Sequence, residues 1–200
     1  MDRHENRRCT EGGDIVTTNN PIVTTSNSVS GSAFVSDTAR VGGTARVGGN
    51  AIVSGNAVVG GNAIVSGNAQ VSDTARVGGT ARVSGNAQVS DTARVGGTAV
   101  VAGNAVVAST AVVSGPEDIA WVDRVGSGNP MTLHRTTTGW QINAGCVTFI
   151  GATVTEVCDQ IRANIKAGPE EWAEAKPDVR ARWAKQVKAA LKFLALSVEP

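Results

Sequence analysis

The sequence contains few of the residues that usually fill a globular core. Tyrosine is absent, aromatic residues make up 4% of the 200 residues, and no long apolar run occurs. The net charge is only +1, and the chain begins with no secretory signal. These absences disfavour an aromatic core, a transmembrane helix and a polyanion-binding protein. They predict a cytoplasmic protein without a membrane or nucleic-acid partner.

Cysteine is scarce as well. Cys9, Cys146 and Cys158 are an odd number without a CxxC pair, which predicts reduced thiols. His134 with Cys146 and Cys158 could be imagined as metal ligands or as a Cys–His pair, but the spacings match no known pattern. The preferred interpretation is two buried structural cysteines and a surface histidine, with no metal and no cofactor.

What the chain does contain is a six-residue repeat. Valine recurs every six residues from Val23 to Val113, and from Ala33 to Ala111 an alanine stands two positions before each valine. Residues two apart face the same side of a strand, and the Gly-Asn, Gly-Thr or Asp-Thr pair that follows permits a tight turn. The pattern predicts short strands stacked into a solenoid, whose coils bury their apolar side only against one another.

A longer copy predicts the number of sides. Residues 72–89 and 90–107 agree at fifteen of eighteen positions, and residues 36–53 repeat the same unit. Duplication in units of three six-residue repeats predicts three strands per coil, which form a triangular prism. A little over five coils would make a rod of about 25 Å, at about 4.8 Å per coil.

The A-x-V-x-G-N pattern of residues 22–114 resembles the hexapeptide-repeat left-handed β-helix, and this resemblance implies the left-handed winding. Such arrays are similar to phage- or prophage-encoded polymer-forming proteins. The stretch VGSGNPMTLHRTTTGWQINAGCVTFIGATVTE also resembles a small module that follows such arrays in phage genomes. The resemblance implies a phage origin, and for a phage-encoded protein the host cytoplasm.

Composition divides the chain into three parts: a flexible tail at 1–21, the β-helix at 22–115, and a small α+β module at 116–200. Gly115-Pro116 breaks the repeat, and all four tryptophans follow it. In the module, the pattern predicts antiparallel strands at 120–125, 131–136 and 140–144 and helices at 153–167 and 178–196. The last helix has an apolar face formed by Val179, Trp183, Val187, Leu191 and Leu194. Its other face is basic.

The residue between alanine and valine points outward, and residues eighteen apart lie above one another. One face, called here the uncharged face, carries Phe34, Ile52, Gln70, Gln88 and Val106. The second face carries Arg40, Val58, Arg76, Arg94 and Val112. The third face carries Ser28, Arg46, Ile64, Arg82 and Val100. Because depletion of charge marks the core of an interface, the uncharged face is the candidate contact between subunits.

Two further columns are candidates for binding. The arginines could bind an anion or nucleic acid, but five arginines against three aspartates leave the array at about +2, so a solvated surface is preferred. They are Arg40, Arg46, Arg76, Arg82 and Arg94. At one corner Asn50, Asn68, Asn86 and Asn104 are eighteen apart, which predicts a hydrogen-bonded ladder along the rod.

The repeat array lacks the residues on which several activities of related solenoids depend. Hexapeptide-repeat acyltransferases usually use a histidine base and an extruded loop, and the array has neither. The related carbonic anhydrases need three histidines for zinc, and ice-binding solenoids display outward threonines. The only histidines are His4 and His134, both outside the array.

The sequence therefore favours a non-catalytic structural or interaction protein. The β-helix would serve assembly, and the C-terminal module would cap its open end or bind a partner such as a host protein. A homo-oligomer is expected, with a trimer as the first hypothesis. Two alternatives stay open: an acyltransferase-like enzyme that uses His134 between subunits, and a protein that binds a small ligand at a subunit interface.

Overall fold

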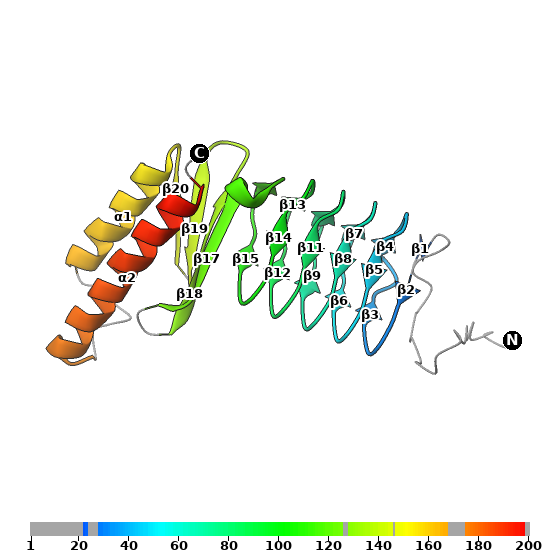
Figure 1. Ribbon diagram of the computed structural model, residues 1–200, viewed down its shortest axis with the longest axis horizontal. Coiled ribbons are helices and arrows are strands. Elements are labelled where there is room, and N and C mark those ends of the chain that lie inside the picture. Colours follow the sequence, from blue (N-terminus) through cyan, green and yellow to red (C-terminus); the bar gives the residue numbers. More distant parts are fainter. Residues whose placement is uncertain (1–21, 24–27, 126–127, 146, 168–174, 199–200) are drawn as a thin grey trace, which may run out of the picture.

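The computed structural model describes residues 22–23, 28–125, 128–145, 147–167 and 175–198. A rod of stacked coils leads into a sheet that is covered by two helices (Figure 1). The predicted tail at 1–21 lies outside the described residues.

The repeat array forms three parallel sheets of two-residue strands, one on each side of a prism. The uncharged face contains β3 (Phe34–Val35), β6 (Ile52–Val53), β9 (Gln70–Val71), β12 (Gln88–Val89) and β15 (Val106–Val107). The second face contains β1 (Ile22–Val23), β4 (Arg40–Val41), β7 (Val58–Val59), β10 (Arg76–Val77), β13 (Arg94–Val95) and β16 (Val112–Val113). The third contains β2 (Ser28–Val29), β5 (Arg46–Val47), β8 (Ile64–Val65), β11 (Arg82–Val83) and β14 (Val100–Val101).

The register confirms the predicted coil of eighteen residues. Each strand pairs with the strand three positions later, so that Gln70 lies beside Gln88 and Arg76 beside Arg94. The alanine and the valine of each Ala-x-Val unit from Ala33 to Val113 point inward and are at most 5% exposed. The three-sided parallel solenoid predicted from the period is therefore confirmed, and its left-handed winding stays a prediction from the resemblance.

Tight corners allow the coils to stack this closely. Gly79 has φ +62°, and a Cβ there would lie 2.8 Å from the backbone nitrogen of Gly97 in the next coil. A larger residue would both strain the backbone and push the coils apart. Asp73 and Asp91 occupy equivalent corner positions with φ 59° and 58°, a conformation that aspartate tolerates better than most residues.

The module after the rod is an antiparallel sheet in chain order. The short helix η1 (Pro116–Asp118) leads into β17 (Ile119–Val125), β18 (Asn129–Arg135), β19 (Trp140–Ala144) and β20 (Val147–Gly151). The first three strands were predicted, whereas β20 was missed. Gly145 has φ +63° between β19 and β20, and the two strands pair antiparallel as a hairpin.

The two helices, α1 (Val154–Ala167) and α2 (Pro177–Val198), cover the side of the sheet that faces away from the rod (Figure 1). Leu133 and Ile142 point from the sheet into a second apolar core with Leu191 and Leu194 of α2. The alternate residues of the same strands, among them His134, point toward the end of the rod. Alternation along the strands thus gives the sheet one apolar face and one polar face.

Candidate interaction surfaces

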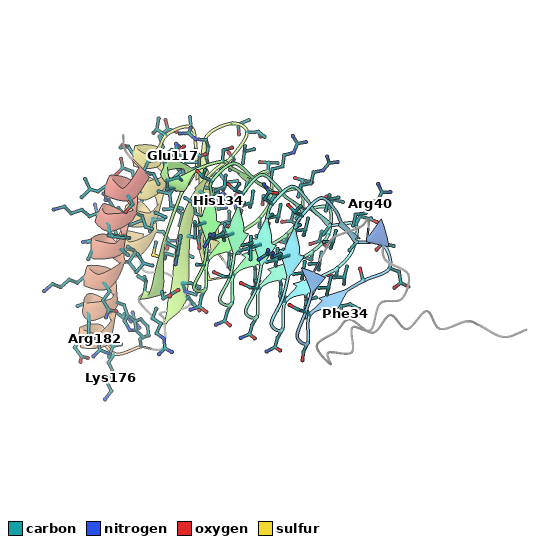
Figure 2. All side chains as sticks on the ribbon, turned by 45° about the vertical axis from the view of Figure 1, so that its right-hand side comes forward. Phe34, Arg40, Glu117, His134, Lys176 and Arg182 are labelled. Atoms are coloured by element: carbon teal, nitrogen blue, oxygen red, sulfur yellow. The ribbon has the colours of Figure 1, made fainter. Side chains whose placement is uncertain are left out.

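The uncharged face is a continuous strip along one side of the rod. Gln70 pairs with Ile52 on one side and Gln88 on the other, and Phe34 pairs with Ile52. Phe34 is 40% exposed and lies at the end of the rod far from the helices (Figure 2), and Ile52, which pairs with it in the next coil, is 39% exposed. The structure therefore brings the predicted subunit-contact residues onto one face, and its exposed apolar part lies at the end away from the module.

Val106 closes the other end of this face and is only half-exposed. Its backbone N–H donates to Oγ1 of Thr132 at 2.9 Å, and its carbonyl accepts from Nδ2 of Asn143 at 3.0 Å. These backbone groups would otherwise form the free edge of the last coil. Side chains of β18 and β19 satisfy them instead. The last coil therefore presents no unpaired backbone group at Val106 with which another chain could pair.

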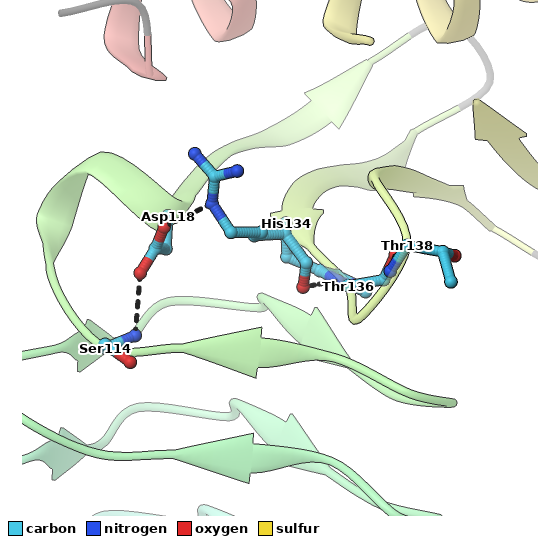
Figure 3. Close-up of polar contacts among 6 residues, drawn as sticks. Ser114, Asp118, His134, Thr136 and Thr138 are labelled. Carbon is cyan, nitrogen blue, oxygen red and sulfur yellow. Dashed lines mark hydrogen bonds and ion pairs between the residues drawn. The ribbon is translucent and has the colours of Figure 1, made fainter. Parts of the chain in front are cut away.

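Side chains of the C-terminal module also bind backbone N–H groups at other corners of the last coil. The backbone N–H of Ser114 donates to Oδ2 of Asp118 at 2.9 Å, and Nε of Arg135 forms an ion pair with Oδ1 at 2.7 Å (Figure 3). At another corner, the N–H of Asn104 donates to Oδ1 of Asp123 at 3.2 Å. The C-terminal module thus contacts the rod through specific bonds to its last coil.

His134 lies inside this junction, and its predicted position on the surface was wrong. The side chain is 0% exposed, and burial lowers the pKa of His134 to about 4, against a small opposing effect of the Arg135 carbonyl. Nδ1 lies 3.3 Å from that carbonyl and Nε2 lies 3.2 Å from Nδ2 of Asn143. A neutral ring that donates from Nδ1 and accepts at Nε2 satisfies both contacts. In the sequence His134 stands between Leu133 and Arg135, and this local pattern gave no sign that a second layer would cover the ring.

The geometry of His134 bears on the acyltransferase hypothesis. A general base must come within hydrogen-bond reach of the proton that it removes. Both ring nitrogens of His134 are engaged inside the chain, and the ring has no exposed surface. The geometry gives this histidine a structural role in the junction.

A column of aspartates borders the uncharged face. Asp37, Asp73 and Asp91 stand at the corner between this face and the second face, and they are called here the aspartate corner. Oδ2 of Asp73 accepts from the backbone N–H of Asp91 at 3.2 Å, and Oδ2 of Asp91 accepts from that of Ser109 at 2.8 Å. These carboxylates are exposed and hold successive coils together, so each still presents an oxygen and a negative charge to solvent.

The arginine columns lie on the second and third faces, as predicted. The side chains of Arg40, Arg46, Arg76, Arg82 and Arg94 are exposed. None of them forms a hydrogen bond or ion pair with another described residue. Beside Arg76 and Arg94 the corner glycines leave a surface groove of about 440 Å³. The structure thus gives the side chains of these arginines no hydrogen-bond or ion-pair partner among the described residues.

The predicted asparagine ladder is confirmed. Nδ2 of Asn50 donates to Oδ1 of Asn68 at 3.1 Å, Asn68 donates to Asn86 at 3.0 Å, and Asn86 donates to Asn104 at 3.0 Å. Each amide donates to one neighbour and accepts from the other along the rod. The ladder uses the amides to hold coils together.

The cysteines and possible metal ligands are only partly described. Cys158 is a buried cysteine of α1, as predicted, whereas Cys9 and Cys146 lie outside the described residues. Within the described ranges, no cluster of three histidine, cysteine or acidic side chains could hold a metal ion.

A scan against family models and a search of curated proteins found no match to this sequence. Within the described part of the chain, no helix has the length and apolar character needed to cross a bilayer.

Proposed function

We propose that this protein is a non-catalytic assembly protein that associates with itself through the uncharged face of its β-helix. The observation that carries the proposal is the pair Phe34 and Ile52, which are 40% and 39% exposed in a strip without charge. Interface cores are depleted of charged residues and enriched in aromatic residues. The other two faces carry arginines in the equivalent slots.

The rod is a suitable support for such a surface. Backbone hydrogen bonds join every described coil to the next, for example from Phe34 N to the Ala51 carbonyl at 2.8 Å. Outward side chains are therefore held at fixed spacing along the axis. A phage-encoded protein with this architecture would act as a spacer or scaffold, and its C-terminal module offers a second surface for a host partner.

A trimer remains the first hypothesis for the oligomer. Isologous pairing of the uncharged face with itself gives a dimer, whereas a closed ring of three needs two different surfaces that fit each other. A trimer therefore requires a complementary surface elsewhere on the chain.

Native mass spectrometry and sedimentation of the full chain test the proposal. Combined Phe34→Ser and Ile52→Ser substitutions should dissociate the assembly into monomers, because they remove the apolar anchors of the face. Val100→Ser is the matched control, since Val100 is 42% exposed but lies on the third face. A wild-type protein that stays monomeric at high concentration, or an assembly that survives the double substitution, would contradict the proposal.

A further inference from the structure

The outer face of α2 carries two kinds of side chain that the protein does not use internally. Phe193 is 55% exposed and Leu196 63% exposed, on the opposite side of the helix from the buried Leu191 and Leu194. The sequence predicted one apolar face for this helix, and the structure leaves this second apolar pair in solvent.

Basic residues precede this apolar pair along the same helix. Arg182, Lys185, Lys188 and Lys192 are exposed, and none forms an ion pair with another described residue. The only acidic residue of α2 is Asp178. The outer face of α2 therefore carries basic side chains from Arg182 to Lys192, and its exposed apolar pair follows at Phe193 and Leu196.

The side of the rod carries the complementary features in a row. The aspartate corner supplies negative charge at Asp91, Asp73 and Asp37, and Phe34 and Ile52 add exposed apolar surface beside it. Phe34 belongs to the same coil as Asp37. From the module toward the N-terminal coils, the corner thus presents a row of three carboxylates, with Arg94, Arg76 and Arg40 on the adjoining second face, and exposed apolar side chains at its N-terminal end.

We infer that the outer face of α2 of one copy docks along the aspartate corner and the uncharged face of a second copy. This inference rests on the proposed assembly function and names the surface that occupies the uncharged face. The two surfaces differ, so the contact is heterologous, and it supplies the second surface that a ring of three copies needs.

The spacings of the charges agree along the two elements. At the rise of an α-helix, Lys185 lies about 4.5 Å along the axis from Arg182, and Lys192 lies about 10.5 Å beyond Lys185. At the spacing of parallel strands, Asp73 lies about 4.8 Å from Asp91, and Asp37 about 9.6 Å beyond Asp73. Three basic residues can therefore meet three aspartates in order.

The same alignment brings the apolar residues together. With Lys192 at Asp37, Phe193 reaches the coil of Phe34, and the small Ala189 lies at the level of Ile52. Leu196 extends past Phe34 at the rim. A pairing of charges that also aligns the exposed aromatic side chains gives the contact both register and apolar burial.

The contact is small, since one helix lies on one side of a rod. Interfaces of this class are weak, and exposed ion pairs contribute modestly and are screened by salt. Association should therefore depend on protein concentration and decrease with ionic strength.

Charge reversal tests the docking in the full chain. Lys185→Glu with Lys192→Glu should weaken self-association about tenfold, because attraction to the aspartate corner becomes repulsion. Asp37→Lys should weaken it in the same direction, and Asp37 is preferred because Asp73 and Asp91 also hold neighbouring coils. Lys166→Glu, at an exposed position of α1, is the matched control and should leave association unchanged.

A mixture of the two reversed proteins provides the decisive measurement by native mass spectrometry. The glutamates introduced into α2 of one protein can meet the lysine introduced at position 37 of the other only in a heterologous contact. Unlike copies should therefore associate more tightly than either variant with itself. Unchanged self-association of the α2 variant, or no rescue on mixing, would overturn the inference. If Phe34→Ser with Ile52→Ser still dissociates the assembly in that case, the proposed function stands and only the docking of α2 fails.

Discussion

Among single residues, the same side-chain type plays different roles according to what covers it. Asparagines on the corner of the rod bond to one another, whereas Asn143 donates to both Val106 and His134 at the junction. His134 depends on that donation, since its Nε2 can accept only when the ring is neutral. The junction therefore contains a group whose protonation opposes folding.

Acid should weaken the protein through His134. The pKa of His134 is about 4 in the folded chain, against 6.5 as its ordinary value, so the unfolded chain binds the proton more tightly. The contribution to stability is complete above pH 6.5 and is lost as the pH falls from 6.5 toward 4. About 2 kcal/mol should be lost between pH 7 and pH 5.

Chemical denaturation at a series of pH values measures this loss. The His134→Gln variant has no titrating ring, so its free energy of unfolding should change less over the same interval, even if its stability at pH 7 differs from that of the wild type. Parallel curves for the two proteins between pH 7 and pH 5 would show that His134 is not the responsible group.

Among the elements, the last coil depends on β18 and β19 for its backbone partners. Thr132 supplies the acceptor for the Val106 N–H, and Asn143 supplies the donor for the Val106 carbonyl. A parallel coil normally receives these bonds from the next coil. Here the polar face of an antiparallel sheet replaces that next coil.

Thr132→Val should therefore be costly although the two side chains have the same shape. The substitution leaves the part-buried N–H of Val106 without an acceptor, which costs about 1–3 kcal/mol. Thermal unfolding measures the loss, and hydrogen exchange should show a faster amide at Val106. Thr155→Val, at an exposed position of α1, is the control, and equal effects of the two substitutions would argue against the bond.

In the molecule as a whole, the backbone edge of the last coil of the rod must be covered. The module joins the last coil through Asp118, Asp123, Thr132 and Asn143, and it has an apolar core of its own beneath the two helices. The helices face away from the rod (Figure 1). One module thus both covers the last coil and carries the surface of α2.

Removal of residues 116–200 should convert a defined protein into one that associates through its coil ends. Truncation after Gly115 removes the groups that cover the edges of β15 and β16, and such edges pair with other chains. Light scattering should show growing assemblies whose size does not depend on Phe34 or Ile52. A truncated chain that stays monomeric and folded would show that the module is not needed to protect this edge.

The rod could be predicted from the order of residues alone. The period of six, the duplication of eighteen and the Ala-x-Val alternation specify which residues point inward, and the structure confirms each. Such local patterns suffice because every coil repeats the same contacts with its neighbour. The same spacing of eighteen residues also predicted the uncharged face and the asparagine ladder.

Where the repeat ends, the outcome depends on packing between distant parts of the chain. His134 is buried because the polar face of the sheet lies against the last coil, and no local pattern around it shows that covering layer. Phe193 and Leu196 stay exposed because α2 buries a different side against the sheet. Both outcomes depend on how the sheet packs, against the rod on one face and against α2 on the other. These contacts join residues that are far apart in the sequence.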